Sequence, residues 1–217
     1  NPVLAAGQTA HGEVRAAIYT GSATNGQWVY VTHSQRVDPL PGVPAPMLPP
    51  SLPLPGDVLR SSLLVAGQDQ SVLFVVGPAP QDHPSCSGGT NLVSVFVLTN
   101  SAASAPTATA QPASELCGRF QGAYFNATLP DDMQSTPALV TLHHGEGVAA
   151  WRMSMRAAGP ASVSSALDLR MGGCEGPSGL GWFGTPGGDL VFCHRREPSS
   201  PSTDRVDRVV CERAATP

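Results

Sequence analysis

A chain of 217 residues with 41% hydrophobic residues can bury a substantial core in one large domain or two small ones. Only 13% of the residues are charged, all 12 basic residues are arginine, and the formal net charge is −4. Because phosphate binding requires a basic face, this composition argues against a nucleic-acid partner. The longest apolar runs are too short to cross a bilayer, so we expect no membrane span.

Short strands joined by turns are the main pattern of the chain. Its 23 glycines and 22 prolines are typical of many short strands rather than of helices. Residues 13–19 alternate between apolar and polar positions, and residues 28–32 are aromatic and β-branched, which together predicts a hairpin. Residues 59–66 and 71–76 predict a second strand pair. Residues 92–98 are apolar on both faces, as in a central strand.

Residues 120–159 read as strand, turn, strand, tight turn and strand, and the rest of the chain is organised around them. The cleanest alternation lies in the last part of this segment, at residues 148–158. Trp151, Met153 and Met155 occupy one face of this strand, so we expect all three to be buried. The other face carries two arginines that we expect to be exposed, Arg152 and Arg156. Three further strands are expected, at residues 166–171, 190–193 and 206–211. The predicted fold class is all-β, an Ig-like or Greek-key antiparallel β-sandwich, formed as one sandwich or as two small ones.

A proline-rich segment interrupts this pattern. Eight prolines fall within the 17 residues from 39 to 55. Their fixed φ angles and missing N–H groups exclude helix and interior strand and leave polyproline II. The segment is either a ligand for a proline-binding domain or an extended loop packed on the sandwich. We favour the loop, with four apolar anchors, Met47, Leu48, Leu52 and Leu54.

Residues 101–114 are rich in Ser, Ala, Thr and Pro, which predicts an internal linker. It would separate an N-terminal β-sandwich at residues 1–100 from a second β-domain at residues 115–217.

The five cysteines lie far apart in the sequence, and their spacing matches neither a C-x-x-C pair nor a zinc finger. Dispersed cysteines beside a glycan sequon favour an oxidising compartment with disulfides. We predict Cys174–Cys193 across a glycine-rich connection and Cys86–Cys117 across a polar loop. Cys211 is then unpaired, or pairs with a region or partner outside this chain. The alternative is five buried, reduced cysteines.

Asn126 begins an Asn-Ala-Thr triplet, the acceptor pattern for an N-linked glycan. A glycan at Asn126 would place the protein outside the cell or at the cell surface. Surrounding segments read FNATL at residues 125–129 and STPA at residues 135–138, followed by a turn at Gly145 and an amphipathic strand. With these motifs, residues 120–159 resemble the CHRD domain of chordin and of bacterial and algal extracellular proteins. The resemblance implies an Ig-like β-sandwich with an extracellular binding or matrix role, and it transfers no catalytic residue.

Histidine supplies the main candidate for chemistry. His143 and His144 are adjacent, and in principle they could build a zinc or copper site with another histidine, namely His11, His33, His83 or His194. Adjacent strand positions face opposite sides of a sheet, so His143 and His144 cannot both bind one ion without distortion. Residues 85–88 and 176–179 place serine near glycine, but neither segment carries the G-x-S-x-G nucleophile motif. We therefore predict no catalytic residue, no metal and no cofactor.

The expected function is that of a non-enzymatic secreted glycoprotein module, structural or adhesive, in a cell wall, matrix, surface appendage or assembly. Its partners would be other extracellular proteins, glycans or copies of itself. Trp182 and Phe183, in a glycine-rich loop expected at residues 172–188, are the candidate binding surface. Two alternatives remain open: a secreted ligand-binding or decoy protein of viral origin, and a metal-dependent extracellular enzyme that uses His143 or His144.

Overall fold

The computed structural model contains seventeen β-strands and one short 3-10 helix, η1 (Pro112–Ser114), in the part of the chain that it describes. The described residues are 3–22, 24–32, 36–47, 61–87, 90–100, 105–120, 123–130, 132–133, 136–144, 147–155, 159–170, 179–184, 189–196 and 208–215. Only the backbone is described for residue 3 and for residues beyond 168. No helix among the described residues has the length and apolar character that crossing a membrane requires. The predicted all-β antiparallel sandwich is confirmed.

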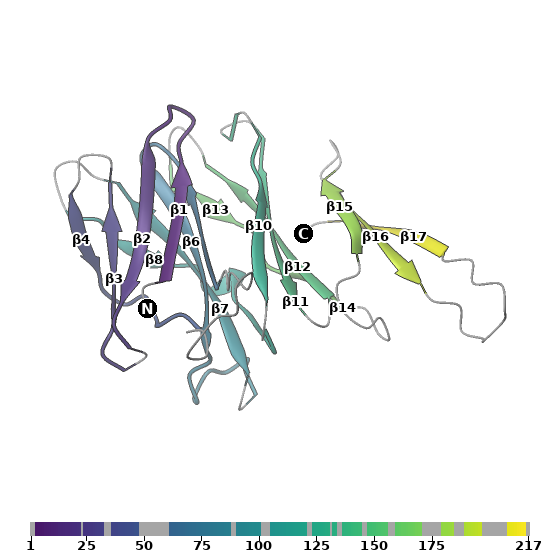
Figure 1. Ribbon diagram of the computed structural model, residues 1–217, viewed down its shortest axis with the longest axis horizontal. Coiled ribbons are helices and arrows are strands. Elements are labelled where there is room, and N and C mark those ends of the chain that lie inside the picture. The colour runs from purple at the N-terminus through teal and green to yellow at the C-terminus, as the bar shows by residue number, and fades with distance from the viewer. Residues whose placement is uncertain are drawn as a thin grey trace, which may run out of the picture.

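Three antiparallel sheets lie face to face in sequence order (Figure 1). The first sheet has the order β1-β2-β3-β4, with strands Val3–Gln8, Val14–Thr20, Gln27–Val31 and Val37–Leu40. The central sheet has the order β5-β6-β7-β8, with β9 also on β7; its strands are Ser62–Ala66, Gln70–Pro78, Asn91–Thr99, Ala108–Ala110 and Leu116–Gly118. The third sheet has the order β10-β11-β12-β13, with β14 also on β12; its strands are Tyr124–Thr128, Ala138–His144, Gly147–Ser154, Ser162–Val163 and Leu167–Arg170.

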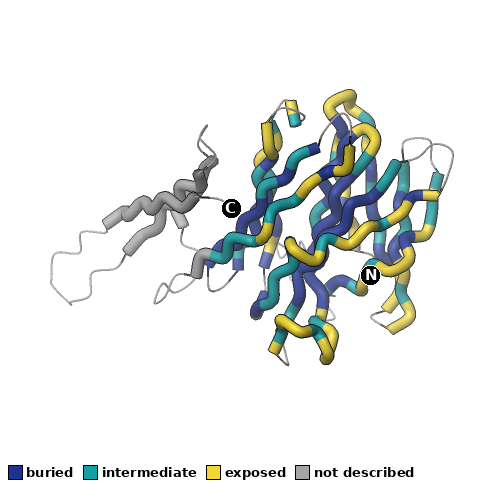
Figure 2. The backbone as a smooth tube through the Cα atoms, turned by 180° about the vertical axis from the view of Figure 1, so that it is seen from behind, coloured by how far each residue is buried: buried dark blue, intermediate teal, exposed yellow. Residues whose placement is uncertain are grey.

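The central sheet is buried on both faces, and Figure 2 shows its strands largely in dark blue. The face that carries Leu73, Val75 and Leu98 packs against the first sheet. The opposite face, which carries Phe74 and Val95, packs against the third sheet. A strand covered on both sides has no polar face, which explains the continuous apolar runs in β6 and β7. The prediction that residues 92–98 form a central strand is confirmed.

Trp151 of β12 lies at the centre of the core between the central and third sheets. Its side chain has no exposed surface. Its ring centroid lies 5.6 Å from that of Phe74 and 6.4 Å from that of Phe125, in tilted or edge-on arrangements. Its indole Nε1–H donates a 2.8 Å hydrogen bond to the carbonyl oxygen of Ser114. The tryptophan therefore joins the third sheet to the central sheet and to the segment that follows β8.

Tyr30 of β3 connects the first sheet to the central one. The side chain is fully buried, and its hydroxyl makes a 2.8 Å hydrogen bond with Ser71 Oγ and donates to Asn100 Oδ1. Burial raises the pKa of the Tyr30 phenol, while its bond to Ser71 and the charge of Arg15 oppose that shift in part. A neutral hydroxyl with two partners satisfies the polar atom in this otherwise apolar interface.

Glycines permit two close approaches between layers. A Cβ atom added at Gly7 in β1 would lie 2.7 Å from the carbonyl oxygen of Leu64, so β1 packs directly on β5. A Cβ atom added at Gly77 would lie 2.5 Å from the carbonyl oxygen of Ala45. Beside it, the backbone N–H of Met47 donates to Val76 O at 2.6 Å.

The start of the proline-rich segment thus packs on the sheet, as expected for the loop interpretation. Met47 is partly buried against the core, whereas Leu48, Leu52 and Leu54 lie outside the described residues. Pro39 is in β4, which is the last strand of its sheet. An edge position suits proline because its missing N–H does not interrupt the hydrogen bonds of an interior strand.

The predicted linker at residues 101–114 includes parts of the sandwich. Ala108–Ala110 forms β8, which pairs with β7. Ser114 is buried, and its hydroxyl donates to the carbonyl oxygen of Val163 at 3.1 Å. The core that contains Trp151 also contains residues from both sides of this segment. Low-complexity composition therefore does not mark a separation of cores here, because small side chains also suit a short strand against a packed sheet.

The structure confirms the buried face predicted for the strand at residues 148–158 and corrects the other face at Arg152. Trp151, Met153 and Met155 are buried as predicted. Arg152 is half-buried rather than exposed, which corrects the prediction. The reason is that Ser164 lies beside it: the Arg152 N–H donates to Ser164 Oγ at 3.0 Å, and the Arg152 carbonyl accepts from Ser164 N–H at 2.9 Å. Arg156 lies outside the described residues.

The remaining strands form a separate antiparallel sheet in the order β15-β16-β17, with strands Gly179–Gly184, Asp189–Arg196 and Arg208–Ala215. The prediction of a loop over residues 172–188 is therefore wrong for the six residues of β15. Glycine-rich sequence favours turns, but here the pairing with β16 stabilises an extended conformation through backbone hydrogen bonds.

Candidate functional site

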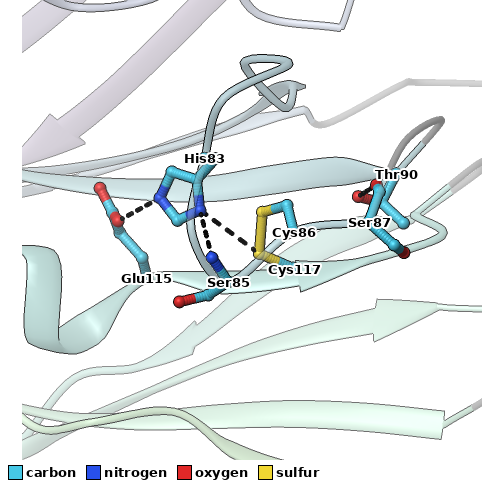
Figure 3. Close-up of a disulfide and its surroundings, with 7 residues drawn as sticks. All are labelled: His83, Ser85, Cys86, Ser87, Thr90, Glu115 and Cys117. Carbon is cyan, nitrogen blue, oxygen red and sulfur yellow. Dashed lines mark hydrogen bonds and ion pairs between the residues drawn. A yellow bond between two sulfur atoms is a disulfide. The ribbon is translucent and has the colours of Figure 1, made fainter.

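A disulfide, a histidine and a carboxylate meet beside one edge of the central sheet (Figure 3). His83 and Cys86 come from the loop that joins β6 to β7. Cys117 lies in β9, which pairs with β7, and Glu115 lies just before that strand. Two backbone hydrogen bonds shape the loop: His83 N–H donates to Pro80 O at 3.1 Å, and Cys86 N–H donates to His83 O at 3.2 Å. These turns bring His83 and Cys86 to the same side of the loop.

The disulfide joins Cys86 to Cys117, as the sequence predicted. The two Cα atoms are 5.4 Å apart, which lies within the usual range for a disulfide. Cys117 is opposite Leu92 in the β7–β9 register. The bond therefore fixes a surface loop to the edge of the buried central sheet.

The ring of His83 lies between the disulfide and Glu115. Nε2 of His83 is 3.1 Å from Oε2 of Glu115, and both side chains are half-buried. Nδ1 accepts a 3.3 Å hydrogen bond from the backbone N–H of Ser85, and it lies 4.0 Å from Sγ of Cys117. An Nδ1 that accepts a hydrogen bond carries a lone pair, so in the neutral ring the proton is on Nε2, which donates to the carboxylate.

Three metal-ligating side chains converge in this arrangement. The ligand atoms of His83, Cys86 and Cys117 all lie within 4.8 Å of one another, and each side chain is half-buried. From the sequence, His83 was predicted only as a possible partner of His143 and His144. The His83-Pro-Ser-Cys86 spacing was the available local signal, but the third member follows 31 residues after Cys86, too far for a spacing motif to show.

The predicted histidine pair does not form a site of this kind. His144 is buried, its ring packs edge-on against Phe120, and its Nε2 lies 3.4 Å from Oδ1 of Asp168. His143 lies on the other face, where its ring stacks on Tyr124 with 4.8 Å between centroids. The two rings thus face opposite sides of β11, as predicted. Among the described residues, neither belongs to a cluster of three metal-ligating side chains.

The position of His143 makes stability depend on pH. Burial lowers the pKa of His143, and the neighbouring His144 lowers it further. Between that lowered pKa and the ordinary value of about 6.5, the unfolded chain binds more protons than the folded one. We therefore expect the free energy of unfolding to fall as the pH is lowered from about 6.5 towards that lowered pKa. Urea unfolding at several pH values measures this.

The matched variants for this prediction are His143→Gln and His11→Gln. The first should flatten the decrease in stability on acidification, whereas the second, at an exposed turn, should leave the slope unchanged. An identical slope in wild type and His143→Gln would contradict the prediction.

The sequon lies on an accessible strand. Asn126 and Thr128 are both exposed in β10, the first strand of the third sheet. The Asn126 side chain makes only a local contact among the bonds described, in which its Oδ1 accepts a 2.9 Å hydrogen bond from Ala127 N–H. A sugar at Asn126 would therefore extend from the edge of the sandwich without displacing a core side chain.

The other predicted cysteine pair falls partly outside the described residues. Cys174 is outside them, while Cys193 lies in β16 directly opposite Cys211 in β17. Trp182 and Phe183 are successive residues of β15, and successive strand positions belong to opposite faces of a sheet. A binding surface on one face of this sheet would therefore contain one of the two aromatic residues.

We expect Cys193 and Cys211 to form a disulfide in the oxidised protein. Directly opposed residues of antiparallel strands have Cα atoms about 4.5–5.5 Å apart, within the range that a disulfide spans. Proteolysis after blocking free thiols, without reduction, should yield a peptide that contains both cysteines. A linked peptide of Cys174 and Cys193 would instead support the original pairing and contradict this one.

Comparison of the chain with protein-family models, with curated proteins and with solved structures finds no match.

Proposed function

We propose that this chain is a non-enzymatic module of a secreted glycoprotein with a structural or adhesive role at a cell surface, matrix or assembly. The observation that carries the proposal is the exposed sequon at Asn126 on an edge strand. The Cys86–Cys117 disulfide supports it, because disulfides persist in oxidising compartments. The resemblance of residues 120–159 to the CHRD domain agrees with the same role.

A glycan at this position would also protect the sandwich. The outer side of an edge strand presents unpaired N–H and C=O groups that can pair with another chain. A sugar on Asn126 would hinder such pairing along β10. The low content of charged residues makes this protection useful, since only 13% of the residues in the chain are charged.

Mass spectrometry of the native protein tests the proposal. We expect a glycan mass on the peptide that contains Asn126, and we expect Cys86 and Cys117 to resist alkylation until a reductant is added. In a eukaryotic secretory cell, Asn126→Gln and Thr128→Ala should each abolish the glycan, whereas Asn25→Gln, at an exposed turn, should retain it. An unmodified Asn126 together with freely alkylated Cys86 and Cys117 in the native protein would contradict the proposal.

A further inference from the structure

We propose that Cys86, Cys117 and His83 form a zinc-binding site when their disulfide is reduced. The same three side chains would then have two mutually exclusive states, an oxidised covalent bridge and a reduced metal bridge. This inference concerns the chemistry of the cluster and does not depend on the proposed extracellular role.

The three side chains are suitable zinc ligands, and they already lie close together. Two thiolates and one imidazole are among the ligands that zinc prefers in proteins. In the disulfide form their ligand atoms already lie within 4.8 Å of one another. In a tetrahedral site with Zn–S bonds of about 2.3 Å, the two sulfur atoms would be roughly 3.8 Å apart. Their Cα atoms, 5.4 Å apart, allow that separation through side-chain rotation.

The hydrogen bonds of His83 orient its ring for metal binding through Nδ1. Its Nδ1 lies 4.0 Å from Sγ of Cys117 and accepts a 3.3 Å hydrogen bond from Ser85 N–H. Its Nε2–H donates to Glu115 at 3.1 Å. Metal-binding histidines usually donate their second ring N–H to a carboxylate or carbonyl, which fixes the tautomer and orients the ring. Glu115 therefore already occupies the supporting position that an Nδ1-bound zinc ion requires.

The surroundings of the cluster leave one of the two sulfur atoms free to move. Cys86 lies in a loop with exposed neighbours, Ser85 and Ser87, so its sulfur can move away from Cys117 without disturbing the core. Cys117 lies in β9, held by its pairing with β7. The metal would thus bind between a fixed sulfur and an adjustable one, and the half-buried position leaves the fourth coordination site to water.

Reduction of the Cys86–Cys117 disulfide needs a two-electron reductant, which a thiol or a phosphine supplies. A phosphine breaks the S–S bond by attack on one sulfur, and water then converts the phosphonium to phosphine oxide. The disulfide takes up two electrons, and protons complete the two thiols. Zinc binding then displaces both thiol protons to solvent, while His83 binds as the neutral ring.

The test uses the full chain with its three remaining cysteines replaced, Cys174→Ser, Cys193→Ser and Cys211→Ser. After reduction by a phosphine without oxygen, Co²⁺ is added as a spectroscopic probe for the zinc site. We expect one Co²⁺ per chain, with a sulfur-to-metal charge-transfer band and the visible bands of tetrahedral cobalt. Zinc should displace the cobalt, and the oxidised protein should give neither signal.

Variants at His83 and Glu115 distinguish a zinc site built from three side chains from metal binding by the two free thiols alone. His83→Asn should weaken Co²⁺ and Zn²⁺ binding and alter the cobalt spectrum, because an imidazole is lost. Glu115→Gln should weaken binding by about 10- to 100-fold while keeping the spectrum. His11→Asn, at an exposed turn, should change neither.

Tryptophan fluorescence reports on the fold throughout, since Trp151 is buried between the central and third sheets. If reduction loosens the protein, metal-dependent recovery of the native fluorescence, lost in His83→Asn, would equally support the site. Absence of stoichiometric binding to the reduced protein, or binding that His83→Asn leaves unchanged, would overturn the proposal.

Discussion

Replacing Trp151 with alanine should lower the free energy of unfolding by about 3–5 kcal/mol, the usual cost of deleting a large aromatic side chain from a core. The side chain is completely buried between Phe74 and Phe125, so its removal leaves a cavity that neither neighbour can fill alone. It also leaves the carbonyl oxygen of Ser114 without its 2.8 Å hydrogen bond. Urea unfolding with the disulfides intact measures the loss.

The matched comparison is Arg152→Ala, one position further along β12. Its side chain is half-buried on the opposite face, and we expect a loss below about 1 kcal/mol. Trp151→Phe should fall between the two, because it keeps most of the packing but not the indole N–H. Equal losses for Trp151→Ala and Arg152→Ala would contradict the assignment of faces on which this core depends.

Alternation along β12 was readable from the sequence because one face of that strand lies in a core. The residues just before Trp151 do not show this alternation in burial. All of Gly147 to Trp151 are buried, although only Ala149 and Trp151 among them belong to the core between the central and third sheets. An alternating pattern shows whether one face of a strand is exposed to solvent. It does not show which other parts of the chain cover that face.

The stacking of three sheets could not be predicted from the sequence, because it depends on contacts between distant segments. The apolar run in β7 correctly indicated burial on both faces. Which residues cover each face depends on pairing between distant segments: Leu73 meets the core of Trp28, while its neighbour Phe74 meets the core of Trp151. Local periodicity contains no information about such partners.

The candidate site shows the same division between local and distant information. The Cys86–Cys117 pair was predicted from a plausible loop, and Asn126 from a short motif. His83 gains significance only because the turn that follows it and the β7–β9 pairing bring it beside Cys117 and Glu115. Conversely, His143 and His144 were conspicuous in the sequence, but their adjacency on a strand separates them in space.

Removing the Cys86–Cys117 disulfide by the double substitution Cys86→Ser and Cys117→Ser should destabilise the protein by about 3–4 kcal/mol. The cysteines are separated by 31 residues, and closing a loop of that length removes conformational entropy from the unfolded chain in proportion to the logarithm of its length. Urea unfolding without reductant, in a background that lacks the other three cysteines, measures the effect. Because net stabilities are about 5–15 kcal/mol, the variant should still fold.

The slope of the unfolding transition distinguishes this mechanism from damage to the folded state. A disulfide keeps the unfolded chain compact, so its removal should raise the m value as well as lower the midpoint. His83→Asn, which leaves the disulfide in place, should cost no more than about 1 kcal/mol, as for a half-exposed ion pair, and should keep the wild-type m value. A double variant with an unchanged m value and midpoint would mean that Cys86 and Cys117 are not joined in solution. The sulfurs would then be free thiols before any reductant is added, and the contact between His83 and Glu115 would still join the loop to the segment beside β9.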